Sequence, residues 1–269
     1  LYRTFLPEGL GFQYNGKPSV DLLAPGILSQ QDPWLVLAGV FEETKRGKFS
    51  SLPLLIQSMK QDNNLVLWDA CSTLLGYASS TQMLKQILDA FHIDLFEEKI
   101  LDIQNYVFKI FSHSMHLWTV PIMLDIYLRT ADHEKAEILP MWFSELLEES
   151  PGLVFYAQLP KSKYENLVLS KYQKLLTTVG LSNAPVRYGR LFSVRASAEL
   201  LLRKLGAEDL DHEEVPNDRM LFEAATGIDC RSFYCDNAHL QPLAAAAIVE
   251  EFLESPEADK YEEGVRYFF

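Results

Sequence analysis

Apolar positions recur along most of this chain at the spacing of an α-helix. After Asn63 and Asn64, apolar side chains stand at i, i+4, i+7, i+8 and i+11: Leu67, Cys71, Leu74, Leu75 and Ala78. A second segment repeats these offsets and ends at Gly206: Val194, Ala198, Leu201, Leu202 and Leu205. Each set lies on one helical face. Asparagine is a favoured N-cap, and glycine accepts the left-handed conformation after a helix, so both predicted helices carry end signals.

Further amphipathic runs predict helices between and beyond these two. The runs between them are Thr81–Phe91, Lys99–Phe111, Val120–Arg129, Lys135–Glu149 and Tyr164–Val179. Ser79 and Gln82 have the spacing of a capping box for the first run. The alanine-rich run Leu243–Leu253 follows Pro242 and ends before Ser255, as a helix would. Alternating β patterns are scarce, so the sequence predicts an all-α fold.

Both ends of the chain differ from the helical middle. Residues 1–32 contain seven glycines and prolines that interrupt any helix, so we expect a loop-rich N-terminal arm packed on the domain. A single helical-repeat domain is expected over 33–269. The chain closes on Tyr267, Phe268 and Phe269, and three aromatic side chains are expected to dock rather than fray.

The spacing of two helical segments carries a resemblance to a known family. "LPLLIQSMKQDNNLVLWDACSTLLGYAS" (Leu52–Ser79) resembles a helix pair of the HEAT-like α-solenoids, and "VRASAELLLRKLG" (Val194–Gly206) resembles the second helix of another pair. Leu67 and Val194 are 127 residues apart, which equals three units of about 42 residues. A unit of this length falls within the period of such repeats. The resemblance implies an irregular stack of helix pairs and a recognition or scaffolding role. Prolines inside the apolar runs, Pro121 and Pro140, depart from the pattern.

Charge narrows the classes of partner. The chain has 37 acidic and 24 basic side chains, for a net charge of −13, which argues against nucleic acid. The acidic C-terminal part, 208–263, holds 16 acidic and three basic side chains and follows a basic segment, 151–207. Either these two segments pack together and neutralise each other, or the acidic part faces a basic partner.

The cellular setting is predicted from absences in the sequence. No apolar run reaches the roughly 18 residues of a membrane span, so no membrane partner is expected. Three cysteines (Cys71, Cys230 and Cys235) cannot build a disulfide framework, which favours a reducing, cytoplasmic compartment.

A search for chemistry returns few candidates. The sequence contains no phosphate loop, dinucleotide turn, H-E-x-x-H or G-x-S-x-G motif, which excludes those families but not enzymes as a whole. Our prediction is a non-enzymatic protein without a cofactor. His113 and His116 could share a helical face and hold a metal, or be two partly exposed histidines beside a tryptophan. Cys230, Cys235 and His239 form C-x4-C-x3-H, which lacks a fourth zinc ligand; two half-buried thiols are the simpler interpretation.

Two groups of residues are predicted to bind a partner. One is the acidic cluster after Gly206, formed by Asp209, Asp211, Glu213 and Glu214. The alternative interpretation of this cluster is a solvated acidic loop. The other is Tyr188 and Arg190, where ring and cation alternate toward Phe192 and Arg195, as at protein-binding surfaces.

Three functions follow from these observations. The first is a non-enzymatic protein-binding protein, similar in general character to the immunity proteins of bacterial toxin systems, which would cover a basic toxin domain. The second is an adaptor or scaffold subunit whose contact is the basic segment. The third is an enzyme that uses the carboxylates near Asp209 or the paired histidines.

Overall fold

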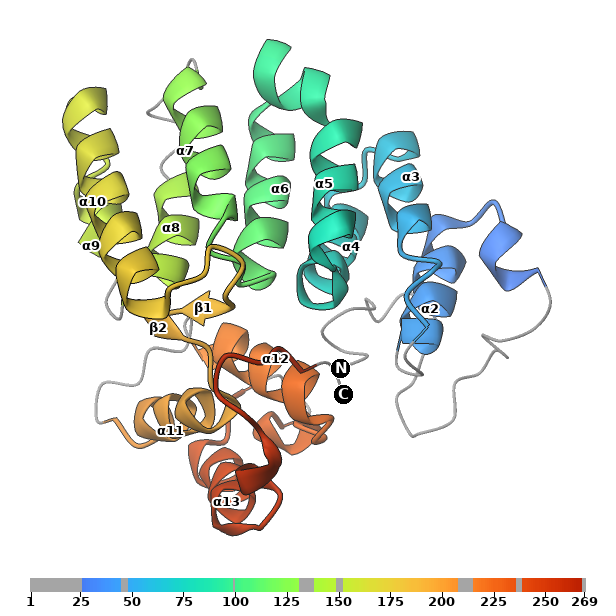
Figure 1. Ribbon diagram of the computed structural model, residues 1–269. Coiled ribbons are helices and arrows are strands. Elements are labelled where there is room, and N and C mark those ends of the chain that lie inside the picture. Colours follow the sequence, from blue (N-terminus) through green and yellow to red (C-terminus); the bar gives the residue numbers. More distant parts are fainter. Residues whose placement is uncertain are drawn as a thin grey trace. The chain divides into compact units, whose positions relative to one another are not determined.

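The computed structural model describes residues 26–44, 48–98, 100–130, 138–148, 152–207, 215–235 and 239–267 (Figure 1). Within these ranges the chain is helical apart from one two-stranded hairpin and two isolated bridges, which confirms the all-α prediction. Packing divides it into two compact units that meet in the sequence between Leu191 and Phe192. We call them the N-terminal unit and the C-terminal unit. The expectation of one repeat domain over 33–269 stays a prediction.

The described helices and strands are as follows. The N-terminal unit contains α2 (Pro33–Thr44), α3 (Pro53–Gln61), α4 (Leu65–Ala78), α5 (Thr81–Ala90), a π-helix (Ile93–Glu97), α6 (Leu101–His113), α7 (Thr119–Arg129), α8 (Leu139–Leu147), α9 (Gly152–Phe155), α10 (Lys161–Val179), β1 (Val186–Arg187) and β2 (Arg190–Leu191). The C-terminal unit contains α11 (Val194–Leu205), α12 (Val215–Thr226) and α13 (Pro242–Glu254). Every helix that the apolar spacing predicted is present among them.

Two predicted helix ends are wrong in detail. The cap of α5 is Ser80, whose Oγ accepts a hydrogen bond from Met83 N at 3.3 Å; Ser79 instead closes α4, with its N–H donating to Leu75 O at 2.9 Å. Gly206 ends α11 at φ −93°, so it does not adopt the left-handed conformation. Its N–H continues the helical pattern by donating to Leu202 O.

The two prolines that depart from the repeat pattern begin helices. Pro140 is the second residue of α8, and Pro121 lies in the first turn of α7. The N–H groups of a first turn have no partner within the helix, so a proline there sacrifices no hydrogen bond. These prolines therefore mark helix boundaries.

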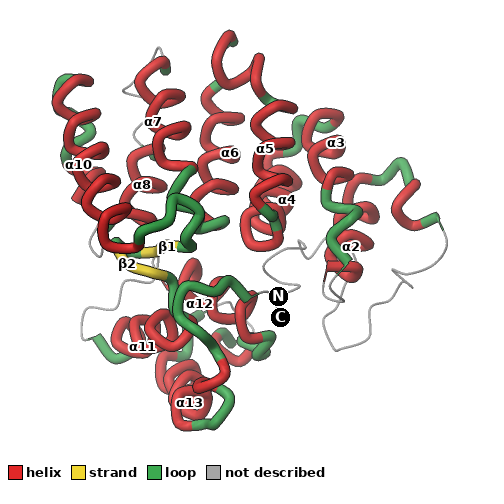
Figure 2. The backbone as a smooth tube through the Cα atoms, in the orientation of Figure 1, coloured by secondary structure: helices red, strands yellow, loops and turns green. Residues whose placement is uncertain are grey.

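An inner row of three parallel helices, α4, α6 and α8, forms the centre of the N-terminal unit (Figure 2). Their first two turns are joined, since Tyr106 Oη donates to Leu65 O at 3.1 Å and Trp142 Nε1 donates to Asn105 Oδ1 at 2.9 Å. Closer to their other ends, Ser112 Oγ donates to a carboxylate of α8 at 2.9 Å. The three helices are thus held in register along their whole length.

A glycine sets the distance between α4 and α6. A Cβ placed on Gly76 would lie 2.5 Å from the Cβ of His113, which is too short for two non-bonded carbon atoms. The imidazole of His113 then stacks on the ring of Tyr77, with centroids 4.8 Å apart and planes 5° from parallel. Glycine inside a helix costs about 1 kcal/mol relative to alanine, and here it allows this close packing.

The helices α3, α5, α7 and α10 lie beside the inner row, and their ends line up. Lys60 Nζ at the end of α3 donates to Ala90 O at the end of α5, at 2.6 Å. Lys161 Nζ at the start of α10 donates to Leu128 O near the end of α7, at 2.9 Å. The ends of α3, α5 and α7 and the start of α10 therefore share one end of the unit with the starts of α4, α6 and α8. Leu52–Ser79 forms the predicted helix pair.

The chain ends are described in part. Of the predicted arm, residues 1–25 lie outside the described ranges, while Ile27 and Leu28 pack over Gly39 of α2. At the other end, Tyr267 meets the ring of Tyr261 edge-on, with centroids 4.8 Å apart, and its hydroxyl accepts from Glu262 N at 2.9 Å. Tyr267 is thus docked as expected, whereas Phe268 and Phe269 lie outside the described residues.

The C-terminal unit has its own core, in which α11 packs on α12 and α13. Phe222 and Phe252 pack edge to face with centroids 5.2 Å apart. The second of the two matched apolar faces, on α11, belongs to this unit, whereas the first, on α4, belongs to the other. The two matched faces thus lie in different units, and the 127-residue repeat interval stays a prediction.

Replacing Gly76 with alanine tests the close approach of α4 and α6. Because the new methyl group meets His113 Cβ, Gly76→Ala is expected to lower the free energy of unfolding by about 2 kcal/mol, measured by urea denaturation. Gly206→Ala is the matched control: its Cβ would meet nothing closer than 3.7 Å. The control should leave stability unchanged or slightly raised. Equal stability of the two variants would contradict the close packing.

Candidate functional site

The structure places only two of the six predicted partner-binding residues. Asp209, Asp211, Glu213 and Glu214 lie outside the described residues, so their role stays a prediction. Tyr188 and Arg190 belong to the hairpin of the N-terminal unit, one in the turn and the other in β2.

This hairpin turns at Tyr188 and Gly189, which lie between the paired residues Arg187 and Arg190. Both turn residues have positive φ, 52° and 73°, as a type I′ turn requires. A tyrosine in this conformation costs about 1 kcal/mol. Two backbone hydrogen bonds oppose that cost: the N–H groups of Tyr188 and Gly189 donate to the carbonyls of Glu145 and Leu146, at 2.8 and 3.0 Å. The turn therefore caps the last carbonyls of α8.

The residue before this turn, Arg187, is a buried cation, only 2% exposed. Its Nη1 lies 3.6 Å from Glu145 Oε2, and that same oxygen accepts from Ser112 Oγ. Nη2 donates to the Tyr188 hydroxyl at 3.1 Å, and the guanidinium lies 4.7 Å from the centre of the Tyr188 ring. Tyr188 therefore uses both its ring and its hydroxyl inside the unit, and Arg190 is the exposed member of the predicted pair.

The alternation of rings and cations past the hairpin does not continue as one surface feature. Phe192 is buried in the C-terminal unit, and Arg195 forms ion pairs with Glu199 and Asp259. Phe192 and Arg195 therefore have structural roles. The binding of a partner by Tyr188 and Arg190 stays a prediction.

The predicted pair of histidines does not share a helical face. Helix α6 ends at His113, and the chain then turns through Met115, which has φ 60°. His116 follows in an extended bridge, with Nδ1 3.2 Å from Asn183 O. The metal-holding arrangement is therefore wrong, and so is the expectation that both rings are partly exposed, because His113 is fully buried.

His113 is an uncharged imidazole in the interior. Neither ring nitrogen has a hydrogen-bond partner among the described residues, and the ring packs between Tyr77 and the edge of Trp142. Burial holds the pKa of His113 well below its ordinary value, and the charges of Lys109 and Arg187 lower the pKa further. This histidine acts as a packed aromatic ring rather than as an acid or base.

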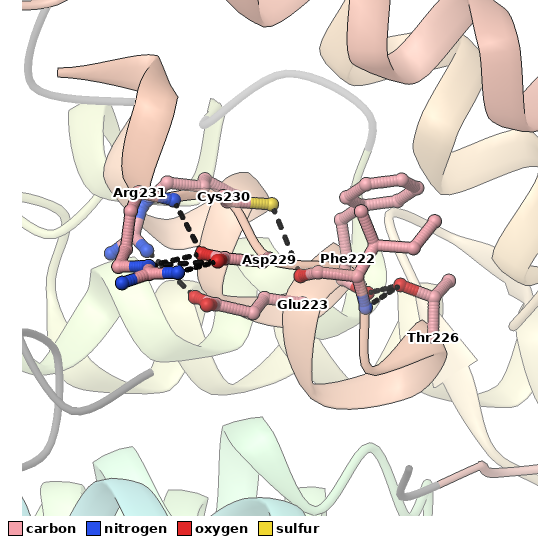
Figure 3. A network of polar contacts seen from close by, with 8 residues as sticks. Phe222, Glu223, Thr226, Asp229, Cys230 and Arg231 are labelled. Carbon is pink, nitrogen blue, oxygen red and sulfur yellow. Dashed lines mark hydrogen bonds and ion pairs between the residues drawn. The ribbon is translucent and has the colours of Figure 1, made fainter. Parts of the chain in front are cut away.

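The second set of candidate metal ligands, Cys230, Cys235 and His239, forms hydrogen bonds within the protein. Figure 3 shows Cys230 beside Asp229 and Arg231 after α12. Its buried thiol donates to Ile228 O at 3.6 Å, and burial, with the charge of Glu223, raises its pKa. In the same loop Cys235 N donates to His239 O at 3.0 Å. All three cysteines are free, and the described part of the chain contains no group of three side chains that could hold a metal.

Ion pairs join the basic and acidic segments of the sequence. Lys204 Nζ lies 2.6 Å from Asp218 Oδ2, and Arg195 Nη1 lies 2.9 Å from Asp259 Oδ1. The expectation that the two segments pack and partly neutralise each other is thus met at two places within the C-terminal unit. This leaves fewer charges of 208–263 free for a partner.

One feature of the N-terminal unit was missed by the sequence analysis. Exposed apolar side chains gather where the helix connections share one end; we call these residues the connection edge: Leu65, Val66, Ile93, Ile100, Ile138 and Leu159. Each is between 37% and 57% exposed. Elsewhere among the described residues of this unit, the exposed large apolar side chains are Phe49, Tyr156 and Leu181.

Contacts between neighbouring segments link the parts of the chain that carry these residues. The ring of Phe91 lies 5.6 Å from Lys60 Nζ of α3, and the ring of Phe96 lies 5.7 Å from the guanidinium of Arg129 in α7. The sequence signal was an apolar residue at the start of successive helices: Leu65 opens α4, Ile100 precedes α6 and Ile138 precedes α8. Ile100 and Ile138 belong to the amphipathic runs Lys99–Phe111 and Lys135–Glu149, so the helical pattern alone does not indicate that they are exposed.

Comparisons with known proteins place the chain in no family: no family model, curated protein or solved structure matches it. Among the described helices, none is both long and apolar enough to cross a membrane.

Removing Glu145 tests the buried ion pair. Glu145→Ala leaves the Arg187 charge in the interior without its carboxylate, so we expect a loss of about 3 kcal/mol in the free energy of unfolding. In the control Asp125→Ala, the exposed Asp125–Arg129 pair is removed and less than about 1 kcal/mol should be lost. Urea denaturation measures both variants. Similar losses in the two would show that Glu145 does not stabilise the buried cation.

His113 gives a pH dependence of known sign. Its folded-state pKa lies below the unfolded value of 6.5, so the unfolded chain binds the proton more readily as pH falls. We expect its contribution to stability to be complete above that value and to fall by up to about 1.4 kcal/mol for each pH unit below it. In His113→Phe this slope should disappear, whereas in the exposed control His239→Phe it should persist. Parallel stability curves for wild type and His113→Phe would contradict this assignment.

Proposed function

We propose that this chain is a non-enzymatic protein that binds another protein through the connection edge. The observation that carries the proposal is the gathering of six exposed apolar side chains at one end of the N-terminal unit. Single exposed apolar residues are ordinary, but a continuous apolar surface with polar residues around it is typical of interaction sites. Here the side chains come from four separate chain segments that internal contacts hold together.

As to architecture, we propose an irregular HEAT-like stack of helix pairs. In support, the pairs α3–α4, α5–α6 and α7–α8 follow one another, and α4, α6 and α8 begin 36 and 38 residues apart. This interval is shorter than the roughly 40–47 residues of HEAT-type repeats, so the proposed stack departs from the regular HEAT period. Stacked pairs offer an extended surface that suits a protein partner.

The partner we propose is a basic protein, such as a toxin domain whose active surface this chain would cover in the manner of an immunity protein. The net charge of −13 supports a basic partner, because complementary charge raises association rates. Asp209, Asp211, Glu213 and Glu214 remain proposed contacts, as do Tyr188 and Arg190. A cytoplasmic location belongs to the same proposal, supported by three free cysteines.

Affinity capture from the native source tests the proposed function. The variant Val66→Ser/Ile93→Ser/Ile138→Ser removes apolar surface from the connection edge without opening the core, so it should fold and lose its partner. The control Leu181→Ser/Leu243→Ser alters two more strongly exposed leucines, 64% and 89% exposed, and should keep it. Quantitative mass spectrometry of the captured proteins gives the readout. Recovery of the same partner with both variants would overturn the role of the edge.

A further inference from the structure

The connection between α5 and α6 places carboxylates among the apolar residues of the connection edge. Residues 93–102 contain four acidic side chains and one lysine, Lys99, which lies outside the described residues. Asp94, Glu97 and Glu98 lie in and beside the π-helix, between Ile93 and Ile100. Glu97 and Glu98 are exposed, and none of the three carboxylates forms an ion pair with a described residue.

The two cations that contact this connection are already engaged. Lys60 donates to Ala90 O and lies over the ring of Phe91. Arg129 Nε pairs with Asp125 Oδ1 at 2.7 Å, and its guanidinium lies over the ring of Phe96. Both therefore hold neighbouring parts of the edge together, while the carboxylates between Ile93 and Ile100 face solvent. Residues 93–102 therefore have a formal charge of −3.

A π-helix at this point adds a second observation. Five residues, Ile93–Glu97, adopt this rare conformation directly after Phe91 and His92. Such segments are uncommon in helices and occur often at functional sites. It is anchored from inside, because Gln104 Nε2 donates to Leu95 O at 3.2 Å and the Leu95 side chain is buried. The anchored segment therefore presents Ile93 and Glu97 to solvent from a fixed backbone.

We infer that the connection edge binds a cationic amphipathic segment of the partner protein, one with an apolar row flanked by lysines or arginines. This inference rests on the proposed function and specifies the chemistry of its partner. The apolar row would cover Val66, Ile93 and Ile100, and the cations would pair with Glu97 and Glu98. A nucleic acid or an anionic lipid surface would instead bring like charge to these carboxylates.

A synthetic peptide provides the probe. We would use a fluorescent peptide made of two copies of Leu-Lys-Lys-Leu-Leu-Lys-Leu, which forms a basic amphipathic helix, and measure its anisotropy on titration with the whole protein. The variant Asp94→Asn/Glu97→Gln/Glu98→Gln should bind it about 10-fold more weakly at about 50 mM salt, and the difference should shrink at about 200 mM salt. The edge variant Val66→Ser/Ile93→Ser/Ile138→Ser should weaken binding at both salt concentrations, because apolar burial is not screened.

Matched controls locate the binding. Glu250→Gln/Glu251→Gln/Glu254→Gln removes three exposed carboxylates of α13 and should leave the peptide affinity unchanged. A peptide with glutamate in place of lysine should not bind. If the α13 variant weakened peptide binding equally, the peptide would be attracted to the net charge alone. If the glutamate peptide bound, the contact would be apolar alone. Either result overturns the inference. A concentration-dependent dimer of the protein, abolished in the apolar edge variant, would do so as well, because a second copy would then be the occupant.

The inference can fail while the proposed function stands. If the natural partner is captured by wild type, lost with the apolar edge variant and retained fully by Asp94→Asn/Glu97→Gln/Glu98→Gln, the edge binds a protein but not through cations. If the apolar edge variant also retains the partner, the proposed function itself fails. The two outcomes are read from the same capture experiment.

Discussion

The parallel register of α4, α6 and α8 is the constraint on which the N-terminal unit depends. Gly76 lets α4 approach α6 until a β-carbon there would touch His113, and Ser112 joins α6 to Glu145 of α8. Once these three helices start at the same level, their connections to α3, α5 and α7 must lie at the same end. The gathering of exposed apolar residues at the connection edge is a consequence of this register.

Charges in this unit are divided between two ends of the inner row. Near the ends of α6 and α8, Arg187 and Glu145 are buried, and the hairpin turn closes over the last carbonyls of α8. Before the start of α6, Glu97 and Glu98 face water and form no ion pair with any described residue. Buried charges must be satisfied within the fold, whereas exposed ones are available to a partner. The first end thus stabilises the structure and the second is suited to recognition.

The sequence predicted the helices well because a helix that buries one face needs apolar residues at the helical period. The faces containing Leu67 and Leu201 are buried as expected, and Asn64 caps α4 by accepting from Val66 N and Leu67 N. The predicted N-cap Ser79 was wrong by one residue, because α4 extends to Ala78 and Ser79 is its C-cap. Local patterns do not report how far a preceding helix continues.

Interactions between distant segments could not be predicted. Nothing local indicates that Arg187 pairs with Glu145, that Tyr188 adopts a left-handed turn, or that His113 is stacked in the interior. These features depend on helices that meet only in the folded unit. The connection edge was missed for the same reason: its isoleucines are far apart in the sequence and become neighbours through the register of the inner row.

Hydrogen–deuterium exchange of the protein alone and with its captured partner tests the central claim most directly. The account predicts that the partner slows exchange in the connections 62–66 and 91–102 and at the start of α10, while the hairpin 186–191 and helix α13 exchange unchanged. Protection centred on the hairpin or the C-terminal unit, with the connections unaffected, would contradict it.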